Sequence, residues 1–127
     1  MWRHFPTFNI KVMKIAIIIP TYNEVDNIYL LIKKILRLRL GLIIVDDNSP
    51  DGTGRVADKL ALKYKEKSKY KVIEVIHRKG KLGLGSAYKT GFKEAFKLGT
   101  EAVVTMDADL SHDPREIPKL LRLLKKL

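Results

Sequence analysis

Residues 15–24 read Ile-Ala-Ile-Ile-Ile-Pro-Thr-Tyr-Asn-Glu, a continuous apolar run followed at once by a polar turn. Five consecutive apolar residues, most of them β-branched, are typical of a strand buried on both faces. Pro20 ends the run, and Asn23 is a candidate N-cap for a helix that starts after the turn. The stretch therefore predicts a buried strand that leads directly into a helix.

The same arrangement recurs along the chain. Further apolar runs rich in β-forming residues cover residues 42–45, 72–76 and 102–106. Segments with apolar residues at helical spacing follow the strands. Their stripes are Ile28, Leu31, Ile32, Ile35 and Leu38; Val56, Leu60 and Tyr64; Ala87, Phe92, Ala95 and Phe96; and Ile117, Leu120, Leu121, Leu124 and Leu127. Gly99 and Thr100 indicate where the third helix stops.

This alternation of strands and helices predicts an α/β fold. Strands that are joined by helices run parallel, and consistent crossovers then produce an open sheet. We therefore predict a Rossmann-like parallel sheet with helices on both faces.

The length of 127 residues and the hydrophobic content of 46% fit one globular domain. We assign residues 1–12 to an N-terminal appendage, because they show no periodicity and no apolar core of a signal peptide. Met13 is an alternative start of translation, and residues 13–127 form the predicted domain. Since the sequence stops inside an amphipathic stretch without a cap, we expect this domain to be truncated at its C-terminus.

The chain contains no cysteine, which excludes disulfides and thiolate metal sites. No apolar run reaches the roughly 18 residues that a membrane span needs. We therefore predict a cytoplasmic protein that could also lie at the cytoplasmic face of a membrane, because the last helical stretch has the basic and apolar faces that suit a lipid headgroup layer. The simpler alternative makes this stretch an ordinary helix that covers the sheet. Self-association is a further expectation, because a truncated sheet would expose an edge strand.

A formal net charge of +11 raises the question of nucleic-acid binding. The acidic residues, however, gather directly after the predicted strands, whereas the basic residues lie on helix faces and in the segment 63–71. An acidic centre within a basic shell fits a metal ion and a diphosphate better than a duplex. We predict no nucleic-acid partner and interpret most of the individual lysines as solvated charge.

A polar cluster follows every predicted strand, at residues 21–24, 46–49, 77–81 and 107–109. The carboxyl ends of parallel strands meet at one edge of a sheet, and open α/β sheets bind their ligands there. The four clusters therefore predict a single site at that edge.

Asp107 and Asp109 flank Ala108 at the end of an extended run, where residues two apart project to the same side. Two carboxylates so placed repel each other unless a cation lies between them. Mg²⁺ or Mn²⁺ prefers such oxygen ligands, and the cation can neutralise the charge of a leaving nucleoside diphosphate. The alternative is that the two aspartates only solvate the end of a strand.

Three other side chains are candidates for contacting a nucleotide. Asp47, rather than Asp46, could accept hydrogen bonds from a base or ribose, whereas Asp51 is interpreted as a turn residue. Tyr22 offers a face for stacking a base, and Glu24 offers an acceptor for a hydroxyl. The simpler alternatives make Tyr22 an edge of the core and Glu24 an acid in the first turn of a helix.

The glycine-rich stretch at residues 80–86 fits neither the P-loop nor the dinucleotide-binding pattern. Its glycines allow a close approach of the backbone before a helix. Lys79 and Lys81 are candidates for neutralising phosphate, or else solvated loop lysines. His112 is a candidate acid or ligand, although a single histidine in a loop is usually neither.

Four segments together carry a family resemblance. They read Pro-Thr-Tyr-Asn-Glu at 20–24, Val-Asp-Asp-Asn-Ser-Pro-Asp-Gly-Thr at 45–53, Lys-Leu-Gly-Leu-Gly-Ser-Ala-Tyr at 81–88, and Met-Asp-Ala-Asp-Leu-Ser-His-Asp-Pro at 106–114. In this order and spacing they resemble the dolichol-phosphate mannose synthases of glycosyltransferase family 2. The resemblance runs from Met13 to the C-terminus and implies the N-terminal, nucleotide-binding half of an A-type glycosyltransferase fold.

The resemblance implies a metal-dependent, inverting transfer of mannose from GDP-mannose to dolichyl or another polyprenyl phosphate. Asp107 and Asp109 would be catalytic and would hold Mg²⁺ or Mn²⁺ with the diphosphate. Ser111 stands where some relatives carry glutamine as a third metal-site residue, and it is a weaker ligand. The nucleotide-sugar-binding residues that the resemblance implies are Pro20, Tyr22, Glu24, Val45, Asp47, Asp107, Ala108 and Asp109.

Three alternatives stay open. The chain could be another family 2 glycosyltransferase, or a truncated remnant that binds the nucleotide sugar without catalysis. Phosphatases of the haloacid dehalogenase type also place Asp-x-Asp after a strand, but they need it on an early strand with Thr or Val two residues further. Here the pair comes late and is followed by Leu110 and Ser111.

Overall fold

The computed structural model describes residues 14–38, 40–65, 73–111 and 113–119. The predicted appendage at residues 1–12, His112 and most of the last helical stretch lie outside these ranges. The elements in chain order are β1 (Ile15–Thr21), α1 (Val25–Leu36), β2 (Gly41–Asp46), α2 (Thr53–Tyr64), β3 (Ile73–His77), α3 (Leu84–Lys97) and β4 (Ala102–Thr105). A short helical segment follows at residues 116–119.

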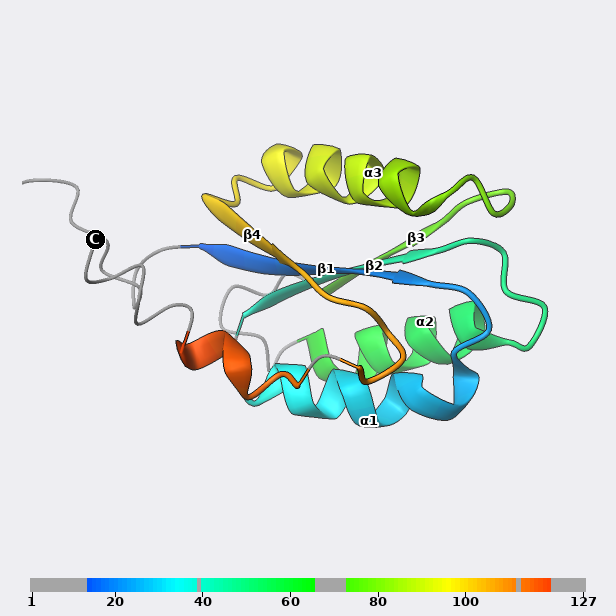
Figure 1. Ribbon diagram of the computed structural model, residues 1–127, viewed down its shortest axis with the longest axis horizontal. Helices are drawn as coiled ribbons and strands as arrows, with labels where there is room; N and C mark the ends of the chain where they lie inside the picture. The colour runs from blue at the N-terminus through cyan, green and yellow to red at the C-terminus, as the bar shows by residue number, and fades with distance from the viewer. Residues whose placement is uncertain (1–13, 39, 66–72, 112, 120–127) are drawn as a thin grey trace, which may run out of the picture.

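The predicted alternation of strands and helices is confirmed over the described residues. All strand pairs are parallel, and the strand order in the sheet is β3-β2-β1-β4 (Figure 1). In the register of the central strand, Ile17 lies between Leu42 of β2 and Val104 of β4. The predicted fold class, a Rossmann-like open parallel sheet with helices on both faces, is therefore correct.

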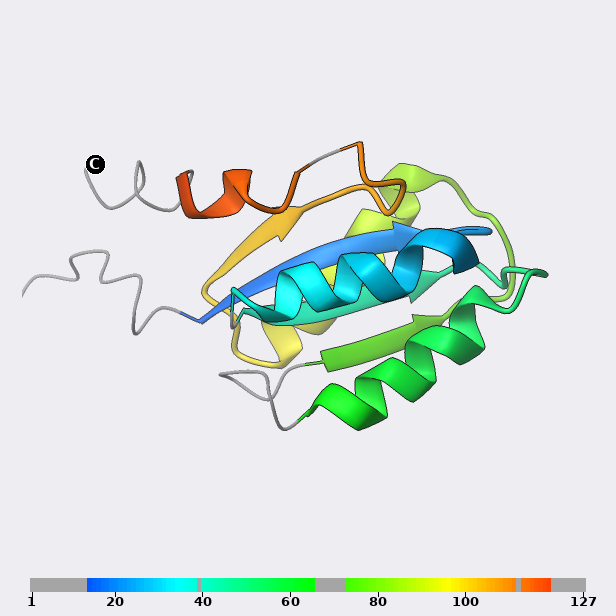
Figure 2. The same cartoon turned by 90° about the horizontal axis from the view of Figure 1, so that it is seen from below.

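Alternate residues of β1 enter two separate cores. Ile17 and Ile19 belong to the core that the sheet forms with α1 and α2, whereas Ala16 and Ile18 belong to the core beneath α3. Figure 1 shows α3 on one side of the sheet and α1 and α2 on the other, and Figure 2 shows these two helices side by side. A strand covered on both faces needs apolar residues at every position, which explains the unbroken run in the sequence.

The chain reverses its direction of winding at β1. From β1 it proceeds through β2 to β3 on one side, and α3 then carries it back to β4 on the other side of β1. Between β1 and β4 the connections diverge at the carboxyl ends of the strands. Such a switch point leaves a crevice in which α/β proteins bind ligands.

The predicted stop of α3 is confirmed in detail. Gly99 has a φ of 77°, and its N–H donates to the carbonyl of Phe96 at 3.1 Å. The N–H of Thr100 donates to the carbonyl of Ala95 at 2.9 Å. These two bonds form a Schellman motif, which satisfies carbonyls at the helix end and needs a residue that tolerates positive φ.

Two local predictions are wrong. Asn23 does not cap α1, because its φ of 54° turns the chain and Glu24 occupies the N-cap position without a side-chain cap bond. Phe96 does not join the buried stripe of α3 and is 75% exposed. Ala87, Gly91 and Ala95, spaced four residues apart, form the buried stripe instead.

This small-residue stripe lets α3 lie very close to β1. A Cβ atom added at Gly91 would lie 2.4 Å from Cγ2 of Ile18. Two carbon atoms cannot approach that closely, so any larger residue must move the helix or distort Ile18. The spacing between α3 and the sheet therefore depends on Gly91.

Among the described residues, no helix has the length and apolar character needed to cross a membrane.

Gly91→Ala should lower the free energy of unfolding by about 1–3 kcal/mol, because overpacking outweighs the helix propensity of alanine, which favours the substitution by about 1 kcal/mol. Denaturant unfolding measures this change. Gly80→Ala is the matched control, since a Cβ there meets nothing within 4 Å. In an Ile18→Ala background the cost of Gly91→Ala should shrink, and an undiminished cost would show that the contact with Ile18 is not its cause.

Candidate functional site

A cavity of about 280 Å³ lies at the carboxyl ends of β1, β2 and β4, where the winding reverses. Lys81, Gly83 and Leu84, from the start of α3 and the loop before it, line one side. Most of the predicted nucleotide-sugar-binding residues line the rest. They are Pro20, Tyr22, Glu24, Asp47, Asp107, Ala108 and Asp109.

Two predicted site residues do not line this cavity. Val45 is fully buried in the core beneath α3, in the same cluster as Ile18. Ser111 is exposed and lines a neighbouring cavity of about 470 Å³. Its backbone N–H nevertheless donates to Oδ1 of Asp109 at 2.9 Å, which holds it beside the carboxylate pair. The structure thus assigns a packing role to the side chain of Val45, and the ligand role of Ser111 stays a prediction.

The carboxylate pair lies in a turn rather than in the extended strand that the sequence predicts. β4 ends at Thr105, and residues 108–109 form a turn. Ala108 is buried beneath the pair, while Asp107 is half-buried and Asp109 is exposed. Both aspartates still line the same cavity. The turn, rather than the alternation of side chains along a strand, brings them to the same side.

Tyr88 orients one of these carboxylates. Its hydroxyl donates to Oδ1 of Asp107 at 3.2 Å, and its ring stacks on Phe92 with the centroids 6.5 Å apart. Burial raises the pKa of Tyr88, and the charge of Asp107 raises it further. The phenol therefore stays protonated and keeps donating its hydrogen bond across the neutral pH range.

Asp107 and Asp109 are the lining residues of this cavity that could hold a hard divalent cation. Mg²⁺ is usually bound by one or two carboxylates together with substrate phosphates and water, and Asp107 and Asp109 supply two such carboxylates. Within the described ranges, no group of three or more His, Cys, Asp and Glu side chains could hold a metal ion by itself.

A buried ion pair joins Asp47, which lines the cavity at the end of β2, to Arg78. Nε of Arg78 donates to Oδ1 of Asp47 at 2.6 Å, and Nη2 donates to Oδ2 at 2.9 Å. Both side chains are only 8% exposed. Nη1 of Arg78 also donates to Oγ of Ser86 at 2.6 Å. The hydrogen bonds to Asp47 raise the pKa of Arg78 above its ordinary value.

Sequence reasoning missed Arg78 as a site residue. It stands in the polar cluster at residues 77–81, directly after β3. The signal that could have found it is charge balance, because a carboxylate expected to be buried at one strand end needs a cation at a neighbouring strand end. Asp47 and Arg78 follow adjacent strands whose register pairs Asp46 with His77.

Asp46 has an internal role. It is 2% exposed, and its Oδ1 accepts hydrogen bonds from Oγ1 of Thr21 and Oγ of Ser49, each at 2.7 Å. Oδ2 accepts the backbone N–H of Ser49 at 3.1 Å. Asp46 thereby ties the end of β1 to the loop after β2. This leaves Asp47, rather than Asp46, facing the cavity.

Asp51 is the turn residue that the sequence indicates, and it also anchors the start of α1. Its carboxylate accepts the backbone N–H of Thr53 at 2.9 Å and that of Val25 at 3.1 Å. Partial burial raises the pKa of Asp51, but the hydrogen bonds from Thr53 and Val25 outweigh it and keep the pKa below its ordinary value. Oγ1 of Thr53 in turn accepts the N–H of Glu24 at 2.9 Å.

Tyr22 and Lys81 meet at the mouth of the cavity. Nζ of Lys81 lies 4.7 Å from the centroid of the Tyr22 ring, and the tyrosine is 38% exposed. The ammonium lies over the ring and brings a positive charge into the cavity that Asp107 and Asp109 also line. Glu24 lines the same side, where its Oε2 accepts Nδ2 of Asn27 at 3.0 Å. The cavity lining therefore combines one lysine and one aromatic ring with the carboxylates of Glu24, Asp47, Asp107 and Asp109.

A parallel α/β sheet with a cavity at its switch point defines a protein of the open α/β class, in which ligands bind at that position. The chain belongs to glycosyltransferase family 2, since the family model described as "Glycosyl transferase family 2" matches residues 16–127. Membership of this family sets aside the phosphatase alternative.

Three curated relatives are similar over most of this chain. It is 43% identical over 107 residues to the polyprenol monophosphomannose synthase of Mycolicibacterium smegmatis. It is 38% identical over 115 residues to the undecaprenyl-phosphate mannosyltransferase of Micrococcus luteus, and 43% identical over 117 residues to the dolichol-phosphate mannosyltransferase of Pyrococcus furiosus. The matches cover 83%, 89% and 89% of this chain, but only 38%, 45% and 30% of the respective relatives.

Removing the cation of the buried ion pair should destabilise the domain. Arg78→Met leaves the carboxylate of Asp47 without its partner, so the free energy of unfolding should fall by roughly 2–4 kcal/mol. Urea denaturation measures this loss. Arg115→Met is the matched control, because Arg115 is 88% exposed in its pair with Asp113, and that variant should keep its stability.

The double variant Asp47→Leu with Arg78→Met tests the cause of the loss. It removes both charges, so it should recover part of the stability that Arg78→Met loses. If the double variant is no more stable than Arg78→Met alone, the unpaired charge is not what destabilises the single variant.

Proposed function

We propose that the cavity binds GDP-mannose and that the protein transfers mannose from it to a polyprenyl phosphate. The observation that carries this proposal is the convergence of the Asp107 and Asp109 carboxylates, the Asp47 carboxylate and Lys81 on one cavity at the switch point of the sheet. The names of the three relatives support it, since each describes a mannosyl transfer or a phosphomannose synthesis that involves a polyprenol.

The choice of guanine rests on Asp47. Guanine presents two adjacent donors, N1–H and the N2 amino group, whereas uracil presents one. A carboxylate can accept from both guanine donors, and each oxygen has a second acceptor position besides the one that Arg78 occupies. Arg78 holds the plane of this carboxylate in a fixed orientation. Tyr22 lines the same cavity and is 38% exposed, so its ring is available for stacking on a base.

The diphosphate then extends toward Asp107 and Asp109, with Lys81 as the nearby cation. Mg²⁺ or Mn²⁺ held by these carboxylates would neutralise the charge that develops on the leaving diphosphate. Tyr88 fixes the rotamer of Asp107 through its hydrogen bond. Glu24 is placed to accept a hydroxyl of the ribose or sugar. Pro20 and Ala108 supply apolar contacts to the same cavity.

The transfer itself needs no protein base in this arrangement. A phosphate monoester is ionised near neutral pH, so its oxygen can attack the anomeric carbon of mannose directly. The new carbon–oxygen bond forms as the bond to the β-phosphate oxygen of GDP breaks, and the electron pair leaves with GDP. Attack on the face opposite GDP inverts the configuration. We place the reaction at the cytoplasmic face of a membrane, because a polyprenyl acceptor is confined to a membrane.

The same cavity supports a second candidate function, namely donor binding without transfer. Every residue to which we give a role contacts the donor side, and none is assigned to the acceptor phosphate. An assay with labelled GDP-mannose, Mn²⁺ and a polyprenyl phosphate in detergent separates the two candidates. Labelled lipid supports the transferase, and donor binding without labelled lipid supports the binding function.

Asp107→Asn and Asp109→Asn should each weaken the Mn²⁺-dependent binding of GDP by at least about tenfold, a loss of roughly 1.4 kcal/mol, because each removes a charged oxygen ligand. Neither should unfold the domain, since relief of repulsion between the two carboxylates offsets lost contacts. Isothermal titration calorimetry measures the affinity. Asp113→Asn, outside the cavity, is the control, and equal GDP affinity in all three variants and the unaltered chain would place the site elsewhere.

Base selectivity gives an independent prediction. At equal concentrations, GDP-mannose with Mn²⁺ should raise the melting temperature more than UDP-glucose with Mn²⁺, because a ligand stabilises the folded state in proportion to its affinity. Asp47→Asn should reduce this difference, since the amide offers only one acceptor oxygen. Equal or reversed shifts for the two donors would reject guanosine and mannose while leaving another family 2 donor open.

A further inference from the structure

The loop between β3 and α3 combines positive charge with exposed apolar side chains. Residues 79–85 read Lys-Gly-Lys-Leu-Gly-Leu-Gly and contain no acid. Leu82 is 65% exposed and Leu84 is 56% exposed. We call residues 79–84 the rim loop, because Lys81, Gly83 and Leu84 line the mouth of the donor cavity.

The rim loop is anchored at both ends and open in the middle. Nδ2 of Asn48 donates to the carbonyl of Lys79 at 3.3 Å, and Nη2 of Arg78 donates to the carbonyl of Gly83 at 3.4 Å. A Cβ atom built at Gly80 or at Gly83 would meet nothing within 4 Å. The loop therefore holds Leu82 in solvent from a fixed backbone frame.

An exposed leucine alone requires no explanation, because folded proteins carry many apolar surface atoms. Leu62 on α2 and Phe96 on α3 are even more exposed, at 84% and 75%. The rim loop differs in that two leucines stand two residues apart, alternate with lysine and glycine, and border a cavity. Apolar side chains beside lysines, with no acid between them, are the combination that partitions into the headgroup layer of an anionic bilayer.

We propose that the rim loop inserts Leu82 and Leu84 into a membrane that contains anionic lipid, while Lys79 contacts its headgroups. This inference rests on the proposed function, because a polyprenyl phosphate keeps its hydrocarbon chain in the membrane and presents its phosphate at the surface. Insertion of the rim loop turns the mouth of the cavity toward that surface. The acceptor phosphate then reaches the donor without leaving the bilayer.

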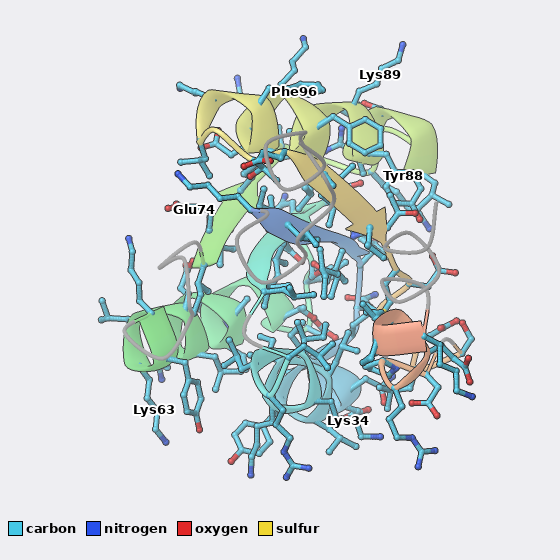
Figure 3. All side chains as sticks on the ribbon, turned by 90° about the vertical axis from the view of Figure 1, so that its left-hand side faces the viewer. Lys34, Lys63, Glu74, Tyr88, Lys89 and Phe96 are labelled. Atoms are coloured by element: carbon cyan, nitrogen blue, oxygen red, sulfur yellow. The ribbon has the colours of Figure 1, made fainter. Side chains whose placement is uncertain are left out.

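The distribution of lysines alone favours a different orientation of the protein on an anionic membrane. The last turns of the three long helices carry Lys33, Lys34, Lys63 and Lys97, at the sheet edge opposite the cavity. Figure 3 views the molecule from that side and shows Lys34 and Lys63 pointing outward from the helices. Leu62 and Phe96 lie toward the same ends of their helices. A purely electrostatic contact would bring this edge to the membrane, so the two orientations place different side chains in the lipid.

A tryptophan reporter distinguishes the two orientations. The chain has a single tryptophan, so Trp2→Phe provides a silent background for Leu82→Trp, Leu62→Trp and Phe96→Trp. Phosphatidylcholine vesicles containing phosphatidylglycerol should shift the emission of Leu82→Trp to the blue, and brominated lipids should quench it. The two control reporters should not change. A shift at position 62 or 96 instead, or none at position 82, overturns the proposal.

An affinity measurement tests the same contact without a reporter. Leu82→Ser should lower the affinity for these vesicles by roughly tenfold, as expected when one leucine no longer enters an apolar layer. Leu62→Ser should not change it. Replacing phosphatidylglycerol by a polyprenyl phosphate shows whether the acceptor suffices as the anionic lipid. Unchanged vesicle affinity in Leu82→Ser, or equal losses in both variants, overturns the insertion of the rim loop.

Donor binding is measured on the same proteins, so that the two proposals fail separately. Leu82 does not line the cavity, and Leu82→Ser should bind GDP-mannose with Mn²⁺ as the unaltered chain does. Absence of donor binding in both proteins refutes the proposed function, even if the Leu82→Trp reporter enters the lipid. Intact donor binding without vesicle contact leaves the proposed function standing and refutes the insertion.

Discussion

Burial of β1 on both faces and pairing on both edges is the constraint on which the rest of the structure depends. Ile17 and Ile19 need the cover of α1 and α2, and Ile18 needs the cover of α3. A helix covers only one face of a sheet. After β3 the chain therefore crosses to the second face as α3 and returns beside β1 as β4. That return creates the switch point, and the cavity lies there because the loops at the ends of β1 and β4 diverge.

The carboxylates at the carboxyl ends of the strands divide into two groups, according to whether they line the cavity. Asp46 and Asp51 accept hydrogen bonds from the loops around them and hold the ends of β1, α1 and α2 together. Asp47, Asp107 and Asp109 line the cavity instead. Both groups accept internal hydrogen bonds, but only the second group borders the space that a ligand could enter. The framework carboxylates thus fix the backbone from which the ligand-facing ones project.

Two positively charged side chains reduce the electrostatic repulsion among the carboxylates at this edge of the sheet. Arg78 balances Asp47 within a buried, bidentate pair, and Lys81 lies against Tyr22 in the cavity that Asp107 and Asp109 also line. Both cations come from the single connection between β3 and α3, which also carries the exposed leucines of the rim loop. The element that returns the chain across the sheet therefore supplies the charge balance of the donor cavity and the surface that we assign to the membrane.

The sequence alone was sufficient for the strands, the parallel sheet, the stop of α3 at Gly99 and most of the residues that line the cavity, because these follow from signals within a few residues. It failed at Asn23, whose expected capping role passes to the carboxylate of Asp51, and at Phe96, which the small-residue stripe around Gly91 turns toward solvent. It also missed the pairing of Arg78 with Asp47 and of Tyr88 with Asp107. These partners stand 31 and 19 residues apart. Only the register of the strands and the spacing of α3 bring them within hydrogen-bonding distance, so the tertiary structure decided them.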